Sequence, residues 1–164
     1  MLPVFAAEGY TDPMAKQSTI RVLVENRRAR HEYQITDTLE AGLSLLGSEV
    51  KSIRAGQANL AEAYVTLRKS GAWLVRAHIS PYEQANSFNH EPRRDRQLLL
   101  NGHELSRLRK ATAIKGLTIV PLKLVLKGSL IKLNIGIGRG KKQHDKRHAL
   151  KEQQQKREMD RGRR

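Results

Sequence analysis

The sequence predicts a mainly β fold with short helices, in the form of an oligonucleotide-binding-like antiparallel β-barrel followed by a basic C-terminal tail. Three observations lead to this prediction: short β-rich runs joined by glycine-containing turns, one clear helix start at Asn101, and a C-terminal segment without core residues. Few-stranded antiparallel sheets of this size commonly close into a small barrel, because closure removes exposed strand edges. A split α+β sandwich is the alternative arrangement of the same elements.

The length of 164 residues suits one domain with extensions. We assign residues 1–25 to an N-terminal extension that is expected to be disordered, 26–138 to the barrel, and 139–164 to the tail. The sequence from Met14 onward has the form of a translation start, so residues 1–13 are interpreted as an upstream extension or as a disordered arm.

The first strand of the barrel is expected over residues 33–46, where polar and apolar side chains alternate loosely. This pattern predicts either one long strand or two halves that are bent at Gly42. A short helix is predicted to begin at Gly47-Ser48-Glu49 and to end at Ala55-Gly56.

A hairpin is expected next, because the β-rich runs 64–67 and 73–75 flank the turn residues Lys69-Ser70-Gly71. Tyr64 and Trp73 of this hairpin, like Tyr33 before it, occupy strand positions. We interpret all three as core side chains rather than as a platform for base stacking.

Residues 79–96 contain two prolines and show no periodicity, so they are expected to form a loop. Asn101 with Glu104 three residues later resembles a capping box and predicts a helix that ends near Gly116. Its inward side chains are expected to be Leu105, Leu108 and Ala111 or Thr112.

The runs 117–126 and 130–137 predict a second hairpin, with its turn at Lys127-Gly128-Ser129. The glycine-rich stretch 136–142 matches neither a Walker A loop nor a dinucleotide fingerprint. We interpret it as a strand end that leads into a flexible hinge.

The formal charge of +15 indicates a polyanionic partner, bound with strong salt dependence. Nucleic acid is favoured over a membrane, because no apolar run approaches the 18 to 20 residues of a membrane span and the tail lacks an apolar face. The absence of cysteine excludes disulfides and thiolate chemistry and fits a cytoplasmic protein.

The tail over 139–164 carries eleven Lys or Arg residues against four acidic residues, with Leu150 and Met159 as its only sizeable aliphatic side chains. Such a segment buries too little apolar surface to offset the entropy of ordering. We therefore expect it to become helical when it binds a polyanion.

Three guanidinium groups lie within four residues in Asn26-Arg27-Arg28-Ala29-Arg30-His31. Arginine pairs with phosphate and stacks on bases, so this cluster favours an RNA contact over a solvated arm. Lys51 and Arg54 share one face of the predicted helix and either extend this basic surface or form a plain exposed face.

A metal site at His144 and His148 is disfavoured, because no third ligand lies nearby and the flanking lysines would repel a cation. No cofactor is indicated, and no nucleophile–base or paired-carboxylate arrangement points to an enzyme. Two other classes stay open at this stage: a ribosomal or ribosome-assembly protein, and a small RNA-processing enzyme using His31, His144 or His148.

Several blocks of the chain resemble, in the same order, the small protein B family of SsrA-binding proteins. The resemblance runs from about Asn26 to Arg164 and rests on Asn26-Arg27-Arg28-Ala29-Arg30-His31-Glu32-Tyr33, Glu40-Ala41-Gly42, Gly47-Ser48-Glu49-Val50-Lys51-Ser52-Ile53-Arg54-Ala55-Gly56, Ala77-His78-Ile79-Ser80-Pro81-Tyr82, Asn89-His90-Glu91-Pro92, Leu98-Leu99-Leu100, Val120-Pro121-Leu122, Gly140-Lys141-Lys142 and Asp145-Lys146-Arg147. Together these blocks are highly specific.

The resemblance implies a barrel that binds the tRNA-like domain of transfer-messenger RNA and a tail that becomes helical in the empty mRNA channel of a stalled ribosome. It implies no catalysis and no cofactor. The implied partners are transfer-messenger RNA and the small-subunit rRNA around the decoding centre, with elongation factor Tu and alanyl-tRNA synthetase reached indirectly through the RNA. A cytoplasmic monomer is expected.

The RNA-binding residues expected from the resemblance and from the basic clusters are Arg27, Arg28, Arg30, His31, Glu40, Lys51, Arg54, Leu98, Leu99 and Lys132. The residues expected near the decoding centre are Lys141, Lys142, His144, Asp145, Lys146 and Arg147. The chain departs from the family pattern next to the expected RNA-binding leucines: Gln97 precedes them, where the family usually has a basic residue.

Overall fold

The structure is a computed structural model that describes residues 20–85, 89–142, 154–155 and 158–159. Seven strands form one antiparallel sheet in the order β1-β8-β9-β2-β7-β5-β4. Their bounds are β1 Ile20–Glu25, β2 Tyr33–Leu43, β4 Tyr64–Arg68, β5 Gly71–Val75, β7 Arg96–Leu99, β8 Leu117–Lys127 and β9 Leu130–Gly140. A second sheet pairs β3 (Ala58–Asn59) with β6 (His78–Ile79).

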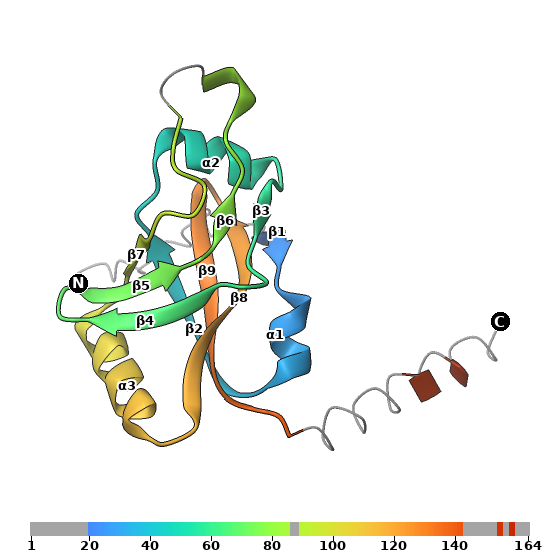
Figure 1. Cartoon of the computed structure of the whole chain (residues 1–164), viewed down its shortest axis with the longest axis vertical. Helices are drawn as coiled ribbons and strands as arrows, with labels where there is room; N and C mark the ends of the chain where they lie inside the picture. The colour runs from blue at the N-terminus through green and yellow to red at the C-terminus, as the bar shows by residue number, and fades with distance from the viewer. Residues whose placement is uncertain (1–19, 86–88, 143–153, 156–157, 160–164) are drawn as a thin grey trace, which may run out of the picture.

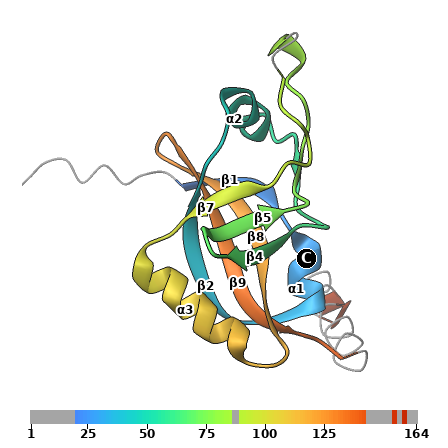
Figure 2. The same cartoon turned by 60° about the vertical axis from the view of Figure 1, so that its left-hand side comes forward.

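The helices lie around the ends of the sheet (Figure 1). They are α1 (Arg27–Glu32), α2 (Gly47–Arg54), α3 (Gly102–Ala113) and the short 3₁₀ helix η1 (Glu83–Ala85). Figures 1 and 2 both show α2 and the segment around η1 projecting from one end of the sheet, with α3 and α1 nearer the opposite end.

The predicted oligonucleotide-binding-like fold is confirmed, with one difference in how the sheet ends. The three longest strands, β2, β9 and β8, form the central ladders, and the sheet curls so that β4 lies against β8. Strands β1 and β4 remain at the two edges of the hydrogen-bonded order, so the barrel is not closed by a ladder. The core fills the concave side, with Ala41, Leu74, Leu133 and Ile135 among its buried residues.

Four predicted elements are confirmed. The long strand is β2, the helix at Gly47 is α2, and the two hairpins are β4–β5 and β8–β9. The capping box also forms, since Glu104 Oε2 accepts a hydrogen bond from Asn101 N at 2.8 Å at the start of α3. Leu108 of this helix is fully buried.

The expectation that residues 1–25 are disordered is wrong for 20–25, which form β1. This strand pairs with β8, with Val22 opposite Val125 and Val24 opposite Leu124 on either side of a shift in register. Residues 1–19 lie outside the described residues. The sequence patterns also did not indicate β3, β6 and β7, which have only two to four residues each.

The glycine-rich stretch does not form the predicted hinge up to Gly140, because it lies inside β9. A Cβ atom on Gly138 would lie 2.5 Å from the carbonyl oxygen of Gln34, and one on Gly136 would lie 3.1 Å from side-chain atoms of Ile35 and Leu122. Both glycines therefore allow close contact between strands within the sheet.

Two of the three aromatic residues expected in the core are not there. Tyr64 is 44% exposed. Trp73 is half-buried, lies 5.0 Å from the Arg68 guanidinium and donates a hydrogen bond to Ser70 Oγ. Tyr33 packs at the margin of a small second cluster around Ala29.

Most of the tail, including His144, Asp145, Lys146 and Arg147, lies outside the described residues. The four described positions beyond Lys142, namely 154–155 and 158–159, are helical and exposed. In the part of the chain that the structure describes, no helix is long and apolar enough to cross a membrane.

Candidate nucleic-acid interface

Four of the sequence-predicted RNA-binding residues line one hollow, which we call the first hollow. Its volume is about 410 Å³, and Glu40, Leu98, Leu99 and Lys132 contribute to its wall. The remaining lining residues come from β2, the β4–β5 turn, β7 and the start of α3: Gly42, Ser70, Gly71, Ala72, Gln97, Leu100, Asn101, Glu104 and Leu105.

Strand register explains why residues far apart in the sequence meet there. Gly42 of β2 pairs with Lys132 of β9 on one side and with Leu99 of β7 on the other. A Cβ atom on Gly42 would lie 3.1 Å from Leu99 Cβ, so glycine allows β7 to approach closely. Gly42 therefore allows β2 and β7 to lie close together. Of the two predicted alternatives, the structure has one long strand, because β2 continues through Gly42.

Two charged side chains of the first hollow, Glu40 and Lys132, lie on one face of the sheet. Glu40 pairs with Asn134, which places Lys132 at the diagonal position two residues away on the same face. The Glu40 carboxylate accepts a hydrogen bond from Lys127 Nζ at 3.4 Å. A carboxylate accepts hydrogen bonds from base amino groups or a 2′-hydroxyl and repels phosphates, whereas Lys132 attracts them.

The two predicted leucines have different environments. Leu98 is 3% exposed and belongs to the hydrophobic core, whereas Leu99 is 57% exposed. Successive residues of a strand point to opposite faces, so only one of them offers its side chain to a ligand. Of the two predicted RNA-binding leucines, only Leu99 therefore has a side chain that is accessible to RNA, and its contact with RNA stays a prediction.

The arginine cluster lies on α1, a helix that the sequence reasoning missed. Asn26 anchors the start of α1, because its buried side chain donates to the carbonyl oxygens of Leu60 and Pro121 and accepts from Ala29 N. Ala29 packs into the small cluster with Val120 and Leu122. Burial of this one face turns the basic side chains toward solvent.

The basic residues of α1 are all exposed, but they differ in their ion pairs. Arg28 Nε donates to Glu32 at 2.7 Å, and this hydrogen bond raises the pKa of the Arg28 guanidinium. Arg27 lies 3.8 Å from Glu25 and is 91% exposed. Arg30 and His31 are also exposed, so α1 presents a basic surface.

The α1 cluster and the first hollow lie at two ends of the β2–β9 ladder. Tyr33, which directly follows α1, precedes Glu40 by seven residues, and roughly 23 Å of strand separates them at about 3.3 Å per residue. A further hollow between them is lined by Arg30, Tyr33, Gln34, Ile35, Thr38, Leu122 and Lys141. A ligand that contacts both ends must extend along this strand.

Lys141, the first residue after β9, is held against α1. Lys141 N donates to the carbonyl oxygen of Glu32 at 2.8 Å, and Lys141 Nζ donates to that of Arg30 at 3.2 Å. A cation is favourable at the C-terminal end of a helix, where carbonyl groups lack intrahelical partners. Lys142 is exposed.

Lys51 and Arg54 of α2 both contact other parts of the protein. Lys51 Nζ lies 5.0 Å from the centre of the Tyr82 ring, and Arg54 Nη2 donates to Ser129 O at 3.0 Å in the β8–β9 turn. Both predicted site residues therefore lie at the α2 end of the sheet, together with Lys127.

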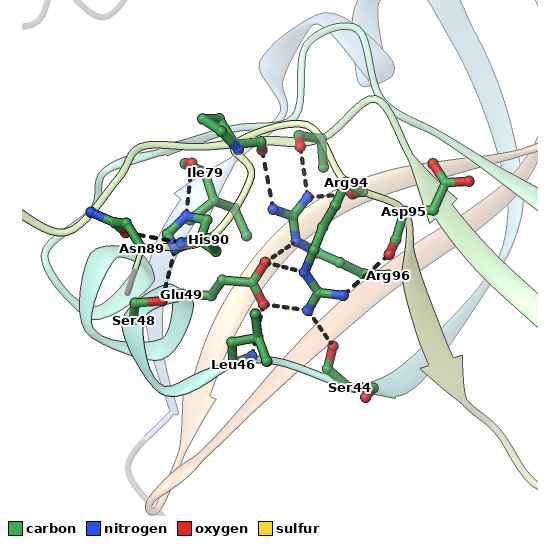
Figure 3. Close-up of polar contacts among 12 residues, drawn as sticks. Ser44, Leu46, Ser48, Glu49, Ile79, Asn89, His90, Arg94, Asp95 and Arg96 are labelled. Carbon is green, nitrogen blue, oxygen red and sulfur yellow. Dashed lines mark hydrogen bonds and ion pairs between the residues drawn. The ribbon is translucent and has the colours of Figure 1, made fainter. Parts of the chain in front are cut away.

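A buried ion-pair network holds the segment that the sequence predicted as a plain loop (Figure 3). Glu49 of α2 accepts from Arg96 Nε at 2.9 Å and from Arg94 Nε and Nη2 at 2.8 and 2.6 Å. Glu49 and Arg96 are fully buried. Arg96 also donates to the carbonyl oxygens of Ala77, Pro92 and Arg94, so its charge is well satisfied.

The ionised form of Glu49 is stabilised by these contacts. Burial raises the pKa of the Glu49 carboxyl, but the hydrogen bonds from Arg94 and Leu46 N and the charge of Arg96 outweigh burial and lower it overall. Burial also lowers the pKa of Arg96, partly offset by the charge of Glu49. The network is thus a salt bridge rather than a neutral pair.

His90 adds a second connection between this segment and α2. Its Nε2 lies 3.1 Å from Ile79 O, and its Nδ1 lies 2.9 Å from Ser48 Oγ. Because a carbonyl only accepts, Nε2 carries the proton and donates to Ile79 O. The segment before β7 is therefore ordered by side chains rather than by a strand ladder.

Sequence reasoning missed Asn26, Glu49, Arg94, Arg96 and Lys127 as important residues. Glu49 accepts from Leu46 N at 2.8 Å at the start of α2, but Leu46 is not one of the polar residues by which a sequence marks a helix start. Within the described residues, no group of three His, Asp or Glu side chains is arranged to hold a metal ion.

Comparison with known proteins gives consistent matches over nearly the whole chain. The family model described as "SmpB protein" matches residues 23–164. The SsrA-binding protein of Microcystis aeruginosa is 53% identical over 148 residues, covering 89% of this chain and 96% of the relative. That of Thermosynechococcus vestitus is 54% identical over 144 residues, covering 87% and 95%.

A solved structure is similar in both sequence and fold. It comes from the work named "tmRNA-SmpB: a journey to the center of the bacterial ribosome". The similarity has a TM-score of 0.62 at 42% identity and covers 77% of this chain and 92% of that one.

Proposed function

This chain belongs to the SmpB protein family, and from that premise we propose that it binds transfer-messenger RNA and acts in the rescue of stalled ribosomes by trans-translation. The names of the similar proteins, which refer to SsrA and to tmRNA on the bacterial ribosome, support this proposal. The high positive charge of the chain fits a large RNA partner.

The observation that carries the proposal is the convergence of Glu40, Leu99 and Lys132 in the first hollow. Three strands bring together an acceptor, an exposed apolar side chain and a cation there. We propose that this hollow contacts the tRNA-like domain of transfer-messenger RNA. Charge attracts the RNA backbone, while the carboxylate and the leucine discriminate among base edges and sugars.

The basic side chains of α1 form the second part of the proposed interface: Arg27, Arg28, Arg30 and His31. Asn26 fixes α1 to the sheet, so these groups keep a constant position relative to β2. A folded RNA can then contact both ends of the ladder, about 23 Å apart along β2. Lys51 and Arg54 are assigned a supporting role, because both already have partners within the protein.

Arg139 and Gly140 of the predicted tail belong to β9. We further propose that the part of the tail after β9 binds small-subunit rRNA in the mRNA channel, with His144 and its neighbours Lys142, Asp145, Lys146 and Arg147 near the decoding centre. Lys141 is better suited to fixing the start of the tail, since its ammonium contacts α1. In this proposal the protein acts in the cytoplasm as a monomer without catalysis, and reaches elongation factor Tu and alanyl-tRNA synthetase only through the RNA.

A binding experiment with two RNAs tests the proposal. The affinity of the full chain for the tRNA-like domain of transfer-messenger RNA is measured beside its affinity for an ordinary tRNA at the same salt concentration. A clear preference for the first RNA is expected. Equal affinities would contradict the proposal and would favour a general RNA-binding or ribosome-assembly protein.

A further inference from the structure

A second hollow lies on the other side of the β4–β5 turn from the first. It has a volume of about 540 Å³ and is lined by Leu67, Arg68, Lys69, Arg109 and Thr112. Three of these five residues are cationic and none is acidic. The hollow therefore combines cations from two rigid elements, the β4–β5 hairpin and α3.

The three cations differ in their partners. Arg68 is fixed, because its Nη2 lies 2.5 Å from Asp95 Oδ2 and its guanidinium lies over the Trp73 ring. Lys69 and Arg109 have no ion pair or hydrogen bond from their side chains to any residue in the described part of the chain. Two unpaired cations and one oriented guanidinium thus face the same open space.

The lack of a partner at Arg109 contrasts with the pairing of another arginine on the same helix. Arg107, two residues before Arg109, forms an ion pair with Asp37 at 2.5 Å. The pairing that is available to one arginine of α3 is absent at the other, although both are exposed. Like charges that share a hollow repel each other weakly, and an anion placed between them removes that repulsion.

The two hollows involve the same turn and the same helix, although no residue lines both. The first hollow is lined by Ser70 and Gly71 of the β4–β5 turn and by Leu105 of α3, and the second by Lys69 of the same turn and Arg109 of the same helix. Positions 105 and 109 are separated by four residues and lie on one face of a helix. A ligand that extends from the first hollow along this face of α3 therefore reaches Arg109 one helical turn after Leu105.

We infer that the second hollow binds backbone phosphates of the same RNA that occupies the first hollow, through Lys69, Arg109 and the remaining N–H groups of Arg68. This inference rests on the proposed function. The lining contains no aromatic ring on which a base could stack, and its groups are donors without acceptor carboxylates, which suits phosphate rather than a base edge. The site adds affinity and orientation but no sequence preference.

The test compares two double variants with the same change in charge. In K69A/R109A the second hollow loses its two unpaired cations. The control K110A/K115A removes two exposed cations of α3 and the following turn that line neither hollow. Affinity for the tRNA-like domain is measured by fluorescence anisotropy between about 50 and 200 mM salt.

For K69A/R109A, the log–log salt slope is expected to become shallower by about 1.4 to 1.8, since each phosphate contact contributes about 0.7 to 0.9. Affinity at about 150 mM salt is expected to fall roughly tenfold, equivalent to about 1.4 kcal/mol. The control is expected to keep the wild-type slope. The conservative exchange K69R/R109K is expected to restore both affinity and slope.

Two results would overturn the inference: the same losses in K69A/R109A and K110A/K115A, or a loss of binding to ribosomes with unchanged binding to the tRNA-like domain. Thermal unfolding of each variant checks that the fold is intact, and the single variants Lys69→Gln and Arg109→Gln repeat the test with smaller changes. Failure of the proposed function is distinct, because it appears in the wild-type chain as equal affinity for the tRNA-like domain and ordinary tRNA.

Discussion

Glu49 and Glu40 each contact basic side chains, yet the structure places these two glutamates in opposite environments. Glu49 and Arg96 have 0% side-chain exposure and lie 2.9 Å apart. Glu40 and Lys127 are 37% and 44% exposed and lie 3.4 Å apart. The same pair of charge types thus stabilises the fold in one region and stays accessible to a ligand in the other.

Burial, not charge, thus separates the residues that stabilise the fold from those proposed to bind RNA. A buried pair needs its partner, because an uncompensated charge in the interior is costly. An exposed pair contributes little, since water and salt screen it.

The largest effect is expected for Glu49→Gln, which leaves Arg96 buried without a counter-charge. We expect the free energy of unfolding to fall by about 3–5 kcal/mol, measured by urea denaturation. Glu40→Gln makes the same chemical change on the surface and is the matched control. A loss of similar size in both variants would remove the distinction between the two regions.

The adjacent leucines give a second contrast. Leu98→Ala is expected to lower the free energy of unfolding by about 2–4 kcal/mol, because it empties part of the core. Leu99→Ala is expected to change it by less than about 0.5 kcal/mol while reducing affinity for the tRNA-like domain. If Leu99→Ala destabilised the protein as much as Leu98→Ala, Leu99 would have to be reassigned to the core.

Acid should weaken the buried network selectively. The folded-state pKa of Glu49 lies below its ordinary value of 4.5, so folding favours the ionised form. Its contribution is complete above the ordinary value and is lost as the pH falls through the lower folded value. Denaturation at a series of pH values should show wild type losing more stability than Glu49→Gln below about pH 4.5. Parallel profiles would contradict this assignment.

Lys132→Ala is expected to reduce affinity for the tRNA-like domain by roughly tenfold, since a phosphate or base contact at the first hollow is removed. Thermal stability should stay within about 0.5 kcal/mol of wild type, because Lys132 has no ion pair in the described part of the chain. Binding is followed by anisotropy. An unchanged affinity would exclude Lys132 from the interface.

The smallest effect is expected for Lys127→Ala, which removes the exposed partner of Glu40. Stability should change by less than about 0.5 kcal/mol. Denaturation of Lys127→Ala, Glu40→Gln and the double variant gives the coupling energy of the pair. A coupling above about 1 kcal/mol would show that this exposed pair also supports the fold.

The sequence predicted the long strand, both hairpins, α2 and α3, because their patterns and turns are local. It did not predict β1, a strand of six residues that was assigned to the N-terminal extension. It also did not predict α1, because the three arginines were interpreted as a basic cluster and not as part of a helix that begins after Asn26. The Glu49–Arg94–Arg96 network links residues up to 47 positions apart, and no periodicity reports such a contact.

The sequence predicted which residues belong to the candidate site better than it predicted how they are arranged. Glu40, Leu99 and Lys132 do line one hollow. They were predicted from the resemblance to a family and not from their spacing in the sequence. The position of Leu98 in the core follows from the alternation of side chains along a strand, once the register of β7 is known. The basic hollow at Lys69 and Arg109 joins a turn to a helix and therefore needed the folded structure.

Hydrogen–deuterium exchange on the full chain, free and bound to the tRNA-like domain, tests the division between the two regions most directly. The account predicts new protection in residues 27–32, 38–43 and 130–134, which carry the exposed charges. Residues 92–96, already fixed by Glu49, should exchange at the same rate in both states. New protection at 92–96 with none at 38–43 would contradict the account.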